Sequence, residues 1–418
     1  MSGHPYPDPA QQPHGATPGW TPPPSGGSWY PPAGTATATL PPAAPPPAPS
    51  PEKRRAGRLR IGVAGLLAGA LIGGGAGAGV VALTDGGGSG GGATAPAQSV
   101  VIRDPANATA VTAAAAKAAP SVVTVYVTSG SGSGSGSGVV LSEDGYVLTN
   151  DHVVTLDGAG QDATVQVRTS DGRLHDATVV GTDPTSDLAV IRLQGAEGLT
   201  PATFADSDDV QVGDLAVAIG APLGLSDTVT DGIISATNRA VATGSTQDDA
   251  TVIDALQTDA AINPGNSGGA LVDATGEVVG INTAIASVAS GAPGSSSQSG
   301  NIGVGFAIPS NTAKRIADEI VRTGSATHAV LGVNARTDGS GEVGTGAQVV
   351  QVQPGGAAED AGLQAGDVVT AVGDRVVTSS TELTAAIRSS APGDTVELSV
   401  ERGGRTSTVE VTLGGSGG

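Results

Sequence analysis

Short apolar runs, some alternating with polar residues and some unbroken, dominate the chain between residues 113 and 309. Runs of about four to eight residues bounded by Gly, Pro, Asn and Asp predict β-strands. Their regular spacing, with no long helical period between them, favours antiparallel barrels or a sandwich. The predicted strand segments are residues 121–128, 145–150, 163–169, 176–183, 187–193, 214–220, 232–238, 270–285 and 304–309.

A helical pattern at residues 310–324 ends this region, and further strands and a short helix follow it. The chain is too long for one ordinary domain. We therefore predict two folded domains, at residues 113–325 and 326–414.

Residues 61–83 form a run of 23 positions without a charge. As a helix this run would cross a hydrocarbon core of about 30 Å. Lys and Arg cluster just before it, which places residues 1–60 in the cytoplasm and the remainder outside. A cleaved signal peptide is the alternative, but its charged segment would begin only near Lys53, and the apolar run exceeds the usual ~7–15 residues. We predict an uncleaved single-pass anchor in the cell membrane.

The segments beside this anchor are rich in small residues. Residues 1–60 contain proline runs and cannot bury enough apolar surface to offset chain entropy, so a disordered cytoplasmic tail is predicted. Residues 84–112 contain "DGGGSGGG" and predict a flexible linker. The Gly–Ser repeat at 129–138 is interpreted as a mobile spacer.

Composition excludes several kinds of chemistry. Cysteine is absent and there are five histidines without an HExxH motif, which argues against disulfides, thiolate sites and a zinc hydrolase. The net charge of -20 argues against nucleic acid as a partner. Neither a metal nor an organic cofactor is predicted.

The segment "DAAINPGNSGGALV" at 259–272 places Ser267 among glycines. Glycine tolerates the backbone angles that turn successive N–H groups toward one point. A nucleophilic serine also needs a base and a group that orients it. Such a turn taken alone is usually structural, so these partners must lie elsewhere in the chain.

Two histidines, His152 and His175, lie in the predicted strand region. His152 follows a strand, where its side chain can face a cleft, whereas His175 is interpreted as a solvated hairpin residue. Asp187 begins an apolar strand, where a carboxylate is desolvated unless a group such as a histidine N–H donates to it. Taken alone, the position of Asp187 fits a strand-capping residue as well as a partner of a catalytic histidine.

The chain order His152, Asp187, Ser267 and six motifs resemble the HtrA/Deg family of trypsin-like serine endopeptidases. The resemblance implies a mainly β, chymotrypsin-like fold of two six-stranded barrels with the active site between them. It implies that His152 is the general base, that Asp187 orients it, that Ser267 forms the acyl-enzyme, and that the N–H groups of Gly265 and Ser267 form the oxyanion hole. The motifs are "GYVLTNDHVV", "DLAVIRL", "VGDLAVAIGAP", "TVTDGIISATNR", "QTDAAINPGNSGGALV" and "VGFAIP".

Ala261 stands six residues before Ser267, at the position that forms the base of the primary specificity pocket in this fold. It has no acid to pair with Arg or Lys, so cleavage after small or medium aliphatic residues is expected, consistent with the family. Ala221 and Leu223 replace the family's more usual Asn and Phe, and residues 286–301 form a long polar segment. Loop-controlled activation is therefore left open.

Residues 326–414 resemble the PDZ domain appended to HtrA proteases, most specifically in "AGLQAGDVV". A PDZ domain adds a peptide strand to its sheet edge and binds the C-terminal carboxylate with loop amides. By resemblance this loop and strand contain Val330, Leu331, Gly332 and Val333, although an ordinary first strand has the same pattern.

Together these features predict a membrane-anchored serine endopeptidase with an outward-facing PDZ domain that degrades misfolded or damaged exported proteins. A non-proteolytic holdase or peptide-binding scaffold is one alternative, and a regulatory protease that cuts one membrane signalling protein is another. The three catalytic residues favour an enzyme over a scaffold. Family analogy implies a homotrimer, although an aromatic content of 2% provides no obvious interface anchor.

Overall fold

The computed structural model describes most of the chain from residue 108 onward. The predicted tail, the predicted anchor at 61–83, nearly all of the predicted linker, Leu223 and the polar segment 286–301 lie outside the described residues. Within the described part, no helix is long and apolar enough to cross a membrane. The described residues are 108–130, 132–156, 163–221, 228–243, 251–283, 303–340 and 343–417.

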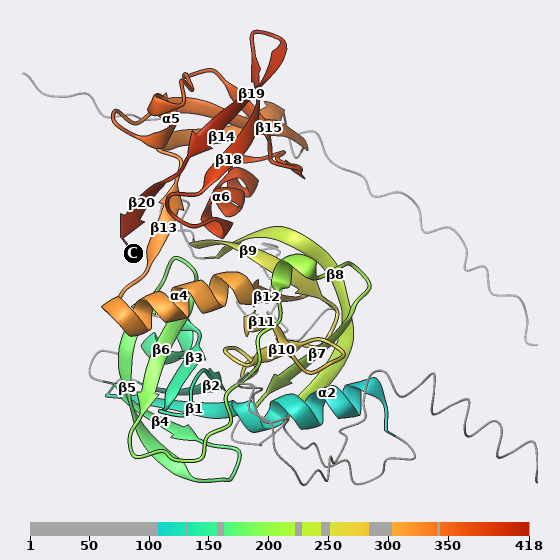
Figure 1. The fold of residues 1–418 in the computed structure, drawn as a ribbon, viewed down its shortest axis with the longest axis vertical. Helices are drawn as coiled ribbons and strands as arrows, with labels where there is room; N and C mark the ends of the chain where they lie inside the picture. Colours follow the sequence, from blue (N-terminus) through green and yellow to red (C-terminus); the bar gives the residue numbers. More distant parts are fainter. Residues whose placement is uncertain are drawn as a thin grey trace, which may run out of the picture. The chain divides into compact units, whose positions relative to one another are not determined.

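The first six described strands close into a barrel in the order β1-β2-β3-β6-β5-β4 (Figure 1). Its interior is filled by branched side chains such as Val125, Val147 and Ile191, each with 0% exposure. Branched residues suit a half-buried pleated surface. The strands are β1 (Val122–Ser129), β2 (Gly132–Val140), β3 (Tyr146–Thr149), β4 (Thr164–Arg168), β5 (Leu174–Asp183) and β6 (Leu188–Leu193).

The next six described strands close a second barrel in the order β10-β11-β12-β9-β8-β7, so the predicted pair of six-stranded barrels is confirmed. Helix α4 (Ser310–Thr323) follows, and Gly324 ends it with a φ of 84°. Ile316 and Ile320 of α4 belong to a core cluster that includes residues of both barrels. The strands are β7 (Leu215–Gly220), β8 (Thr228–Thr243), β9 (Thr251–Thr258), β10 (Ala270–Val272), β11 (Val278–Thr283) and β12 (Gly305–Pro309).

Strand β2 corrects the interpretation of residues 129–138 as a mobile spacer, because its residues 132–139 pair with β1 in continuous register. Three of its glycines, at positions 134, 136 and 138, leave room for neighbouring side chains. A Cβ atom on Gly136 would lie 2.7 Å from Val153, and one on Gly138 would lie 2.6 Å from Val147. The glycines of this repeat therefore allow close packing. The composition did not show this, because a flexible linker has the same Gly–Ser composition.

Helix α2 (Ala110–Ala118) begins inside the predicted linker 84–112 and was not predicted. Ala114 and Ala118 are buried, and their short side chains allow close approach to the second barrel. A Cβ on Gly276 would lie 2.8 Å from the Ala114 carbonyl oxygen. A nearly uniform alanine run has no alternation of polar and apolar residues, so the periodicity on which helix prediction depends is missing.

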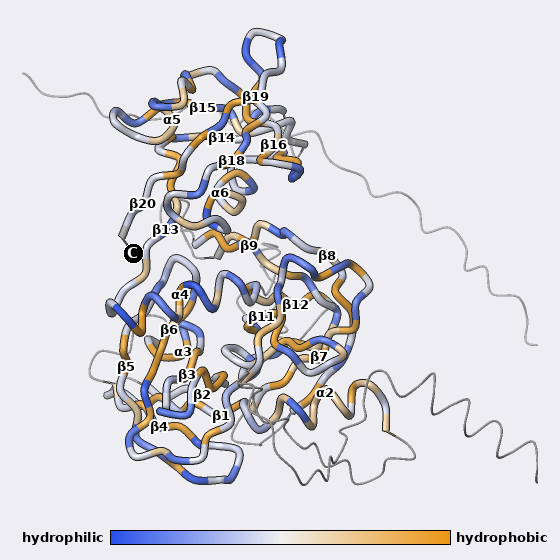
Figure 2. Tube along the Cα trace, viewed as in Figure 1, coloured by the Kyte–Doolittle hydropathy of each residue, from blue (hydrophilic) through white to orange (hydrophobic). Residues whose placement is uncertain are grey.

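The C-terminal domain contains a sheet in the order β14-β15-β16-β18-β19, with β17 paired to β16, and a separate β13–β20 pair. Figure 2 shows apolar segments along the strands of this domain as well as along those of the barrels. Its elements are β13 (Thr327–Val330), β14 (Val333–Ser340), β15 (Val343–Val352), α5 (Ala357–Asp360), β16 (Val368–Val372), β17 (Arg375–Val376), α6 (Ser380–Ser389), β18 (Thr395–Arg402), β19 (Arg405–Thr412) and β20 (Gly414–Gly417).

Candidate active site

His152 and Asp187 lie in direct contact. His152 is on the short helix α3 (Asp151–Thr155), which begins directly after β3 and Asn150. Its Nδ1 lies 2.9 Å and 3.1 Å from the two carboxylate oxygens of Asp187, and its backbone N–H donates to Oδ1 at 3.2 Å. Asp187 is 5% exposed. The two protein donors therefore replace water around this carboxylate.

Two further residues hold Asp187, and the sequence analysis identified neither. Asn150 Nδ2 donates to the Asp187 carbonyl at 2.8 Å. Thr283 Oγ1, on β11 of the second barrel, donates to Oδ2 at 3.0 Å. Asp187 has a φ of 54°, an uncommon backbone conformation for a residue with a side chain. The only sequence signal at Thr283 was that of a strand, so its role depends on long-range geometry.

Ser267 lies in the tight segment between β9 and β10 and is 3% exposed. Gly265 and Gly268 have φ values of 101° and 83°, in the left-handed region that glycine adopts without steric cost. A Cβ on Gly268 would lie 2.2 Å from the Ser137 carbonyl oxygen and 2.4 Å from Thr149 Oγ1. The serine turn therefore fits closely against the first barrel.

Ser137 of β2 ties this turn to the first barrel. Its hydroxyl donates to the Gly265 carbonyl at 2.7 Å and accepts from the Ala221 N–H at 2.8 Å. Its own N–H donates to the Ser267 carbonyl at 2.8 Å. Asp187 is bonded to the second barrel and Ser267 to the first, so the predicted catalytic residues gather where the two barrels meet.

Asp151, beside His152, carries a perturbed carboxyl that the sequence analysis did not single out. Burial, followed by the charge of Asp187, raises its pKa to about 6, while Thr182 and His152 exert smaller opposing effects. Asp183 raises the pKa further. Asp151 therefore changes charge in the pH range in which histidines titrate.

Ala261 lies between β9 and β10, and its carbonyl accepts from Thr230 Oγ1 at 3.0 Å and from Asn266 Nδ2 at 3.2 Å. The nearby Asp259 carboxylate accepts from the Ile233 N–H at 2.8 Å. The side chain at position 261 is thus a methyl group on a fixed backbone, and it offers no charge to a basic substrate residue.

The predicted PDZ loop 330–333 connects β13 to β14. Leu331 is buried, and Gly332 has a φ of 78°. Their carbonyl groups accept from the N–H groups of Ala358 and Gln353, each at 2.8 Å. The loop is therefore held through its carbonyl side against the segment that leads into α5.

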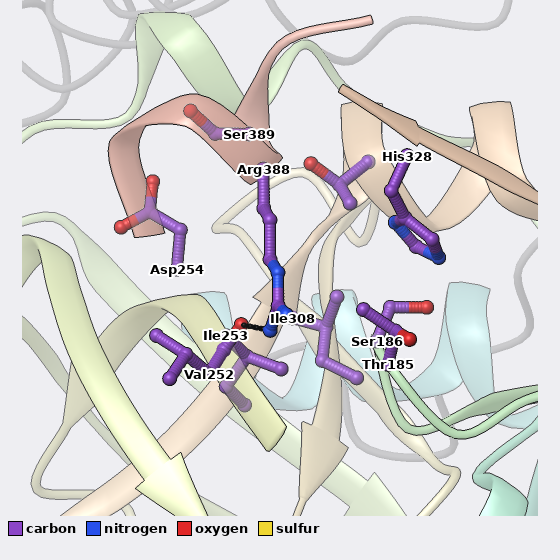
Figure 3. A pocket seen from close by; sticks show the side chains of 10 residues that line it. Thr185, Ser186, Val252, Ile253, Asp254, Ile308, His328, Arg388 and Ser389 are labelled. Carbon is purple, nitrogen blue, oxygen red and sulfur yellow. Dashed lines mark hydrogen bonds between the residues drawn. The ribbon is translucent and has the colours of Figure 1, made fainter. Parts of the chain in front are cut away.

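Helix α6 contacts strand β9. Arg388 donates to the Val252 carbonyl at 3.2 Å, and Arg375 lies 2.9 Å from Asp254. Burial raises the pKa of Asp254 to about 6, and Arg375 partly offsets that effect. Figure 3 shows the pocket beside this contact, with Arg388 bonded at Val252 and with His328 on the pocket wall.

Comparisons with known proteins define the class. A trypsin-like peptidase domain matches residues 136–281, and a PDZ domain matches residues 302–413. Among solved structures, the HtrA-type protease AlgW with a tripeptide is 37% identical, with 73% of this chain and 97% of that chain covered and a TM-score of 0.55. The chain therefore has the domain organisation of a trypsin-like protease with an appended PDZ domain.

Two curated relatives narrow the class. Serine protease PepD of Mycobacterium tuberculosis is 51% identical over 66% of this chain and 60% of its own length. The periplasmic pH-dependent serine endoprotease DegQ of Escherichia coli is 39% identical over 66% of this chain and 58% of its own length. The chain thus spans less than two thirds of these relatives. It belongs to the HtrA/Deg family of serine proteases.

Proposed function

We propose that the protein is a membrane-anchored serine endopeptidase that degrades misfolded or damaged exported proteins through Ser267, His152 and Asp187. The observation that carries the proposal is the contact of both Asp187 carboxylate oxygens with His152 Nδ1, at 2.9 Å and 3.1 Å. This contact keeps the Nδ1 proton in place, so that Nε2 is the basic nitrogen.

In the first half of the reaction, Ser267 Oγ attacks the substrate carbonyl carbon while His152 Nε2 takes the hydroxyl proton. The N–H groups of Gly265 and Ser267 bind the oxyanion that develops. When the C–N bond breaks, His152 returns this proton to the leaving amine and the acyl-enzyme remains.

In the second half, His152 takes a proton from water as the water oxygen attacks the acyl carbon. The new acid leaves when the bond to Oγ breaks, and His152 gives the proton back to Ser267. Throughout, Asp187 accepts the hydrogen bond from His152 Nδ1 and stabilises the imidazolium. Ala261 offers no charge to a basic substrate residue, and by family analogy we expect cleavage after small or medium aliphatic side chains such as Val, Ala or Leu.

The test is cleavage of reduced casein by the full chain in detergent, compared with Ser267→Ala, with cut sites identified by mass spectrometry. We expect cleavage after small aliphatic residues and a loss of about 10⁴-fold or more in kcat in the variant. Cleavage that persists in Ser267→Ala would contradict the proposed nucleophile. If the wild-type protein does not cleave casein, with or without added C-terminal peptides, a peptide-binding scaffold is favoured.

We further propose that β14 binds the C-terminus of a peptide as an added strand. β14 stands at the end of the described sheet order, and α6 lies beside it, with the Ser380 N–H donating to Thr337 Oγ1 at 3.2 Å. An edge strand beside a helix suits peptide addition. Fluorescence anisotropy should show binding of a peptide with a free carboxylate and much weaker binding of its amidated twin. Equal binding would rule out carboxylate capture.

Residues 61–83 are proposed as the anchor, supported by their uncharged length and by the cations before them. We expect the full chain to stay in the membrane fraction after an alkaline wash, and release into the soluble fraction would contradict the anchor. A homotrimer is proposed by family analogy alone, and light scattering of the detergent-solubilised protein would test it.

A further inference from the structure

Asp183 and His328 form a buried pair outside the proposed catalytic residues. Asp183 is the last residue of β5, and His328 lies on β13, after α4. His328 Nε2 is 2.8 Å from Asp183 Oδ1, and the two side chains are 6% and 0% exposed. A buried carboxylate is costly unless donors compensate it, and His328 supplies a donor from 145 residues away in the sequence.

Asp183 also holds the loop that leads to Asp187. Its Oδ1 accepts from the Thr185 N–H at 3.3 Å, and its Oδ2 accepts from the Ser186 hydroxyl. Asp187 comes next, with its φ of 54°. A non-glycine residue keeps such a conformation only when its surroundings impose it. The hydrogen bonds of Asp183 therefore fix the backbone of the loop that presents Asp187.

Other charged groups face the same carboxylate. Arg315 on α4 and Arg388 on α6 interact electrostatically with Asp183, but their hydrogen bonds go to backbone carbonyl groups. Figure 3 shows His328 beside residues 185–186 on the wall of the pocket next to Arg388. Among the described residues, the side-chain hydrogen bond to Asp183 from outside this loop comes from His328.

We propose that His328 is a positioning residue for peptide cleavage: its imidazole fixes Asp183, and Asp183 fixes the loop that presents Asp187 to His152. The inference rests on the proposed function of His152 and Asp187. Through this one hydrogen bond, strand β13, which leads into the C-terminal domain, would help to set the position of Asp187.

The test compares His328→Gln, which keeps a donor near the Nε2 position, with His328→Leu, which fills the space without a donor. His175→Leu serves as the matched control, because His175 lies on β5, the strand that ends at Asp183, and its hydrogen bond is an exposed 3.4 Å contact with the Gln194 carbonyl rather than with Asp183. For each full-length protein, a fluorophosphonate titrates the competent serines, and kcat, KM and the pH profile are measured per titrated site.

We expect His328→Leu to lower kcat about 10- to 100-fold, the size expected for a small misplacement of catalytic groups, with KM changed less than about twofold. The acidic limb of its pH profile should move to lower pH, because a displaced Asp187 stabilises the His152 imidazolium less. His328→Gln should restore most of kcat, and His175→Leu should match the wild type.

Two results would overturn the inference alone: wild-type kcat and pH profile in His328→Leu with only a lower melting temperature, or a well-folded His328→Gln as slow as the leucine variant. A wild-type protein that neither cleaves casein nor reacts with the fluorophosphonate would overturn the proposed function and the inference together.

Discussion

Two segments rich in glycine and serine meet in this molecule, and they use glycine for different reasons. In the turn around Ser267, Gly265 and Gly268 adopt left-handed backbone angles. The described glycines of β2 have ordinary strand conformations, and three of them, Gly134, Gly136 and Gly138, leave space for neighbouring side chains. The first requirement is local to the turn, and the second depends on distant residues.

The two segments are also partners. The Ser137 hydroxyl of β2 bonds the Gly265 carbonyl, and the Ser137 N–H bonds the Ser267 carbonyl. A repeat that resembles a spacer is therefore part of the support of the proposed nucleophile. Substitutions that separate backbone angle, space and hydrogen bonding can test this comparison.

The largest effect is expected for Gly268→Ala, which combines a left-handed φ with a contact of 2.2 Å to a backbone oxygen. Strain and overpacking together should lower the free energy of unfolding by about 3–5 kcal/mol. Gly172→Ala is the control, since Gly172 has a φ of 85° and open space. It should cost only about 1 kcal/mol. Equal losses in urea unfolding would show that the close approach is unimportant.

Ser137→Ala should have the next largest effect. It leaves the Gly265 carbonyl and the Ala221 N–H without their buried partner, at a cost of about 2–3 kcal/mol. Because Gly265 belongs to the proposed oxyanion hole, kcat should fall more than KM rises. Ser133→Ala, exposed on the same strand, should leave both unchanged. If Ser137→Ala is as stable as the wild type and has a normal kcat, the hydrogen bonds of β2 do not support the active site.

The sequence predicted most of what has a local cause. Alternation indicated most of the barrel strands, but it missed β9 and merged β10 and β11 into one segment, residues 270–285. The glycine turn together with two spaced motifs led to Ser267, His152 and Asp187. Contacts between distant segments had no local signal: Thr283 looked like any strand residue, and β2 looked like a linker. Helix α2 was missed because alanine alone gives no period. Long-range contacts therefore decided the roles of Thr283 and β2, which the sequence analysis misjudged.

Gly136→Ala tests the use of space without any strain in backbone angle. Its Cβ would lie 2.7 Å and 2.8 Å from the two Cγ atoms of Val153, directly after His152. Overpacking should cost about 1–2 kcal/mol and lower kcat by displacing α3. Gly132→Ala, with open space on the same strand, should be neutral or slightly stabilising. Calorimetry and casein cleavage of the pair measure the difference, and matching values would refute the packing role.

The smallest effect concerns Asp151, on the helix that the glycines of β2 accommodate. Its pKa rises from 3.8 to about 6 on folding, so the folded state holds more protons between these pH values. Stability therefore declines as the pH rises through this window. Asp151→Asn cannot ionise and escapes the decline, which amounts to about 1 kcal/mol after allowance for solvent screening.

The melting temperature of Asp151→Asn relative to wild type should thus increase from pH 4 to pH 7 and then level off. Asp171→Asn provides the opposite sign, because the hydrogen bond from Thr169 lowers the pKa of that exposed carboxyl and its stabilisation is lost as the pH falls. If the Asp151 difference stayed constant with pH, the carboxyl would not be enclosed. The packing of α3 against β2 would then be looser than the contacts of Gly136 require.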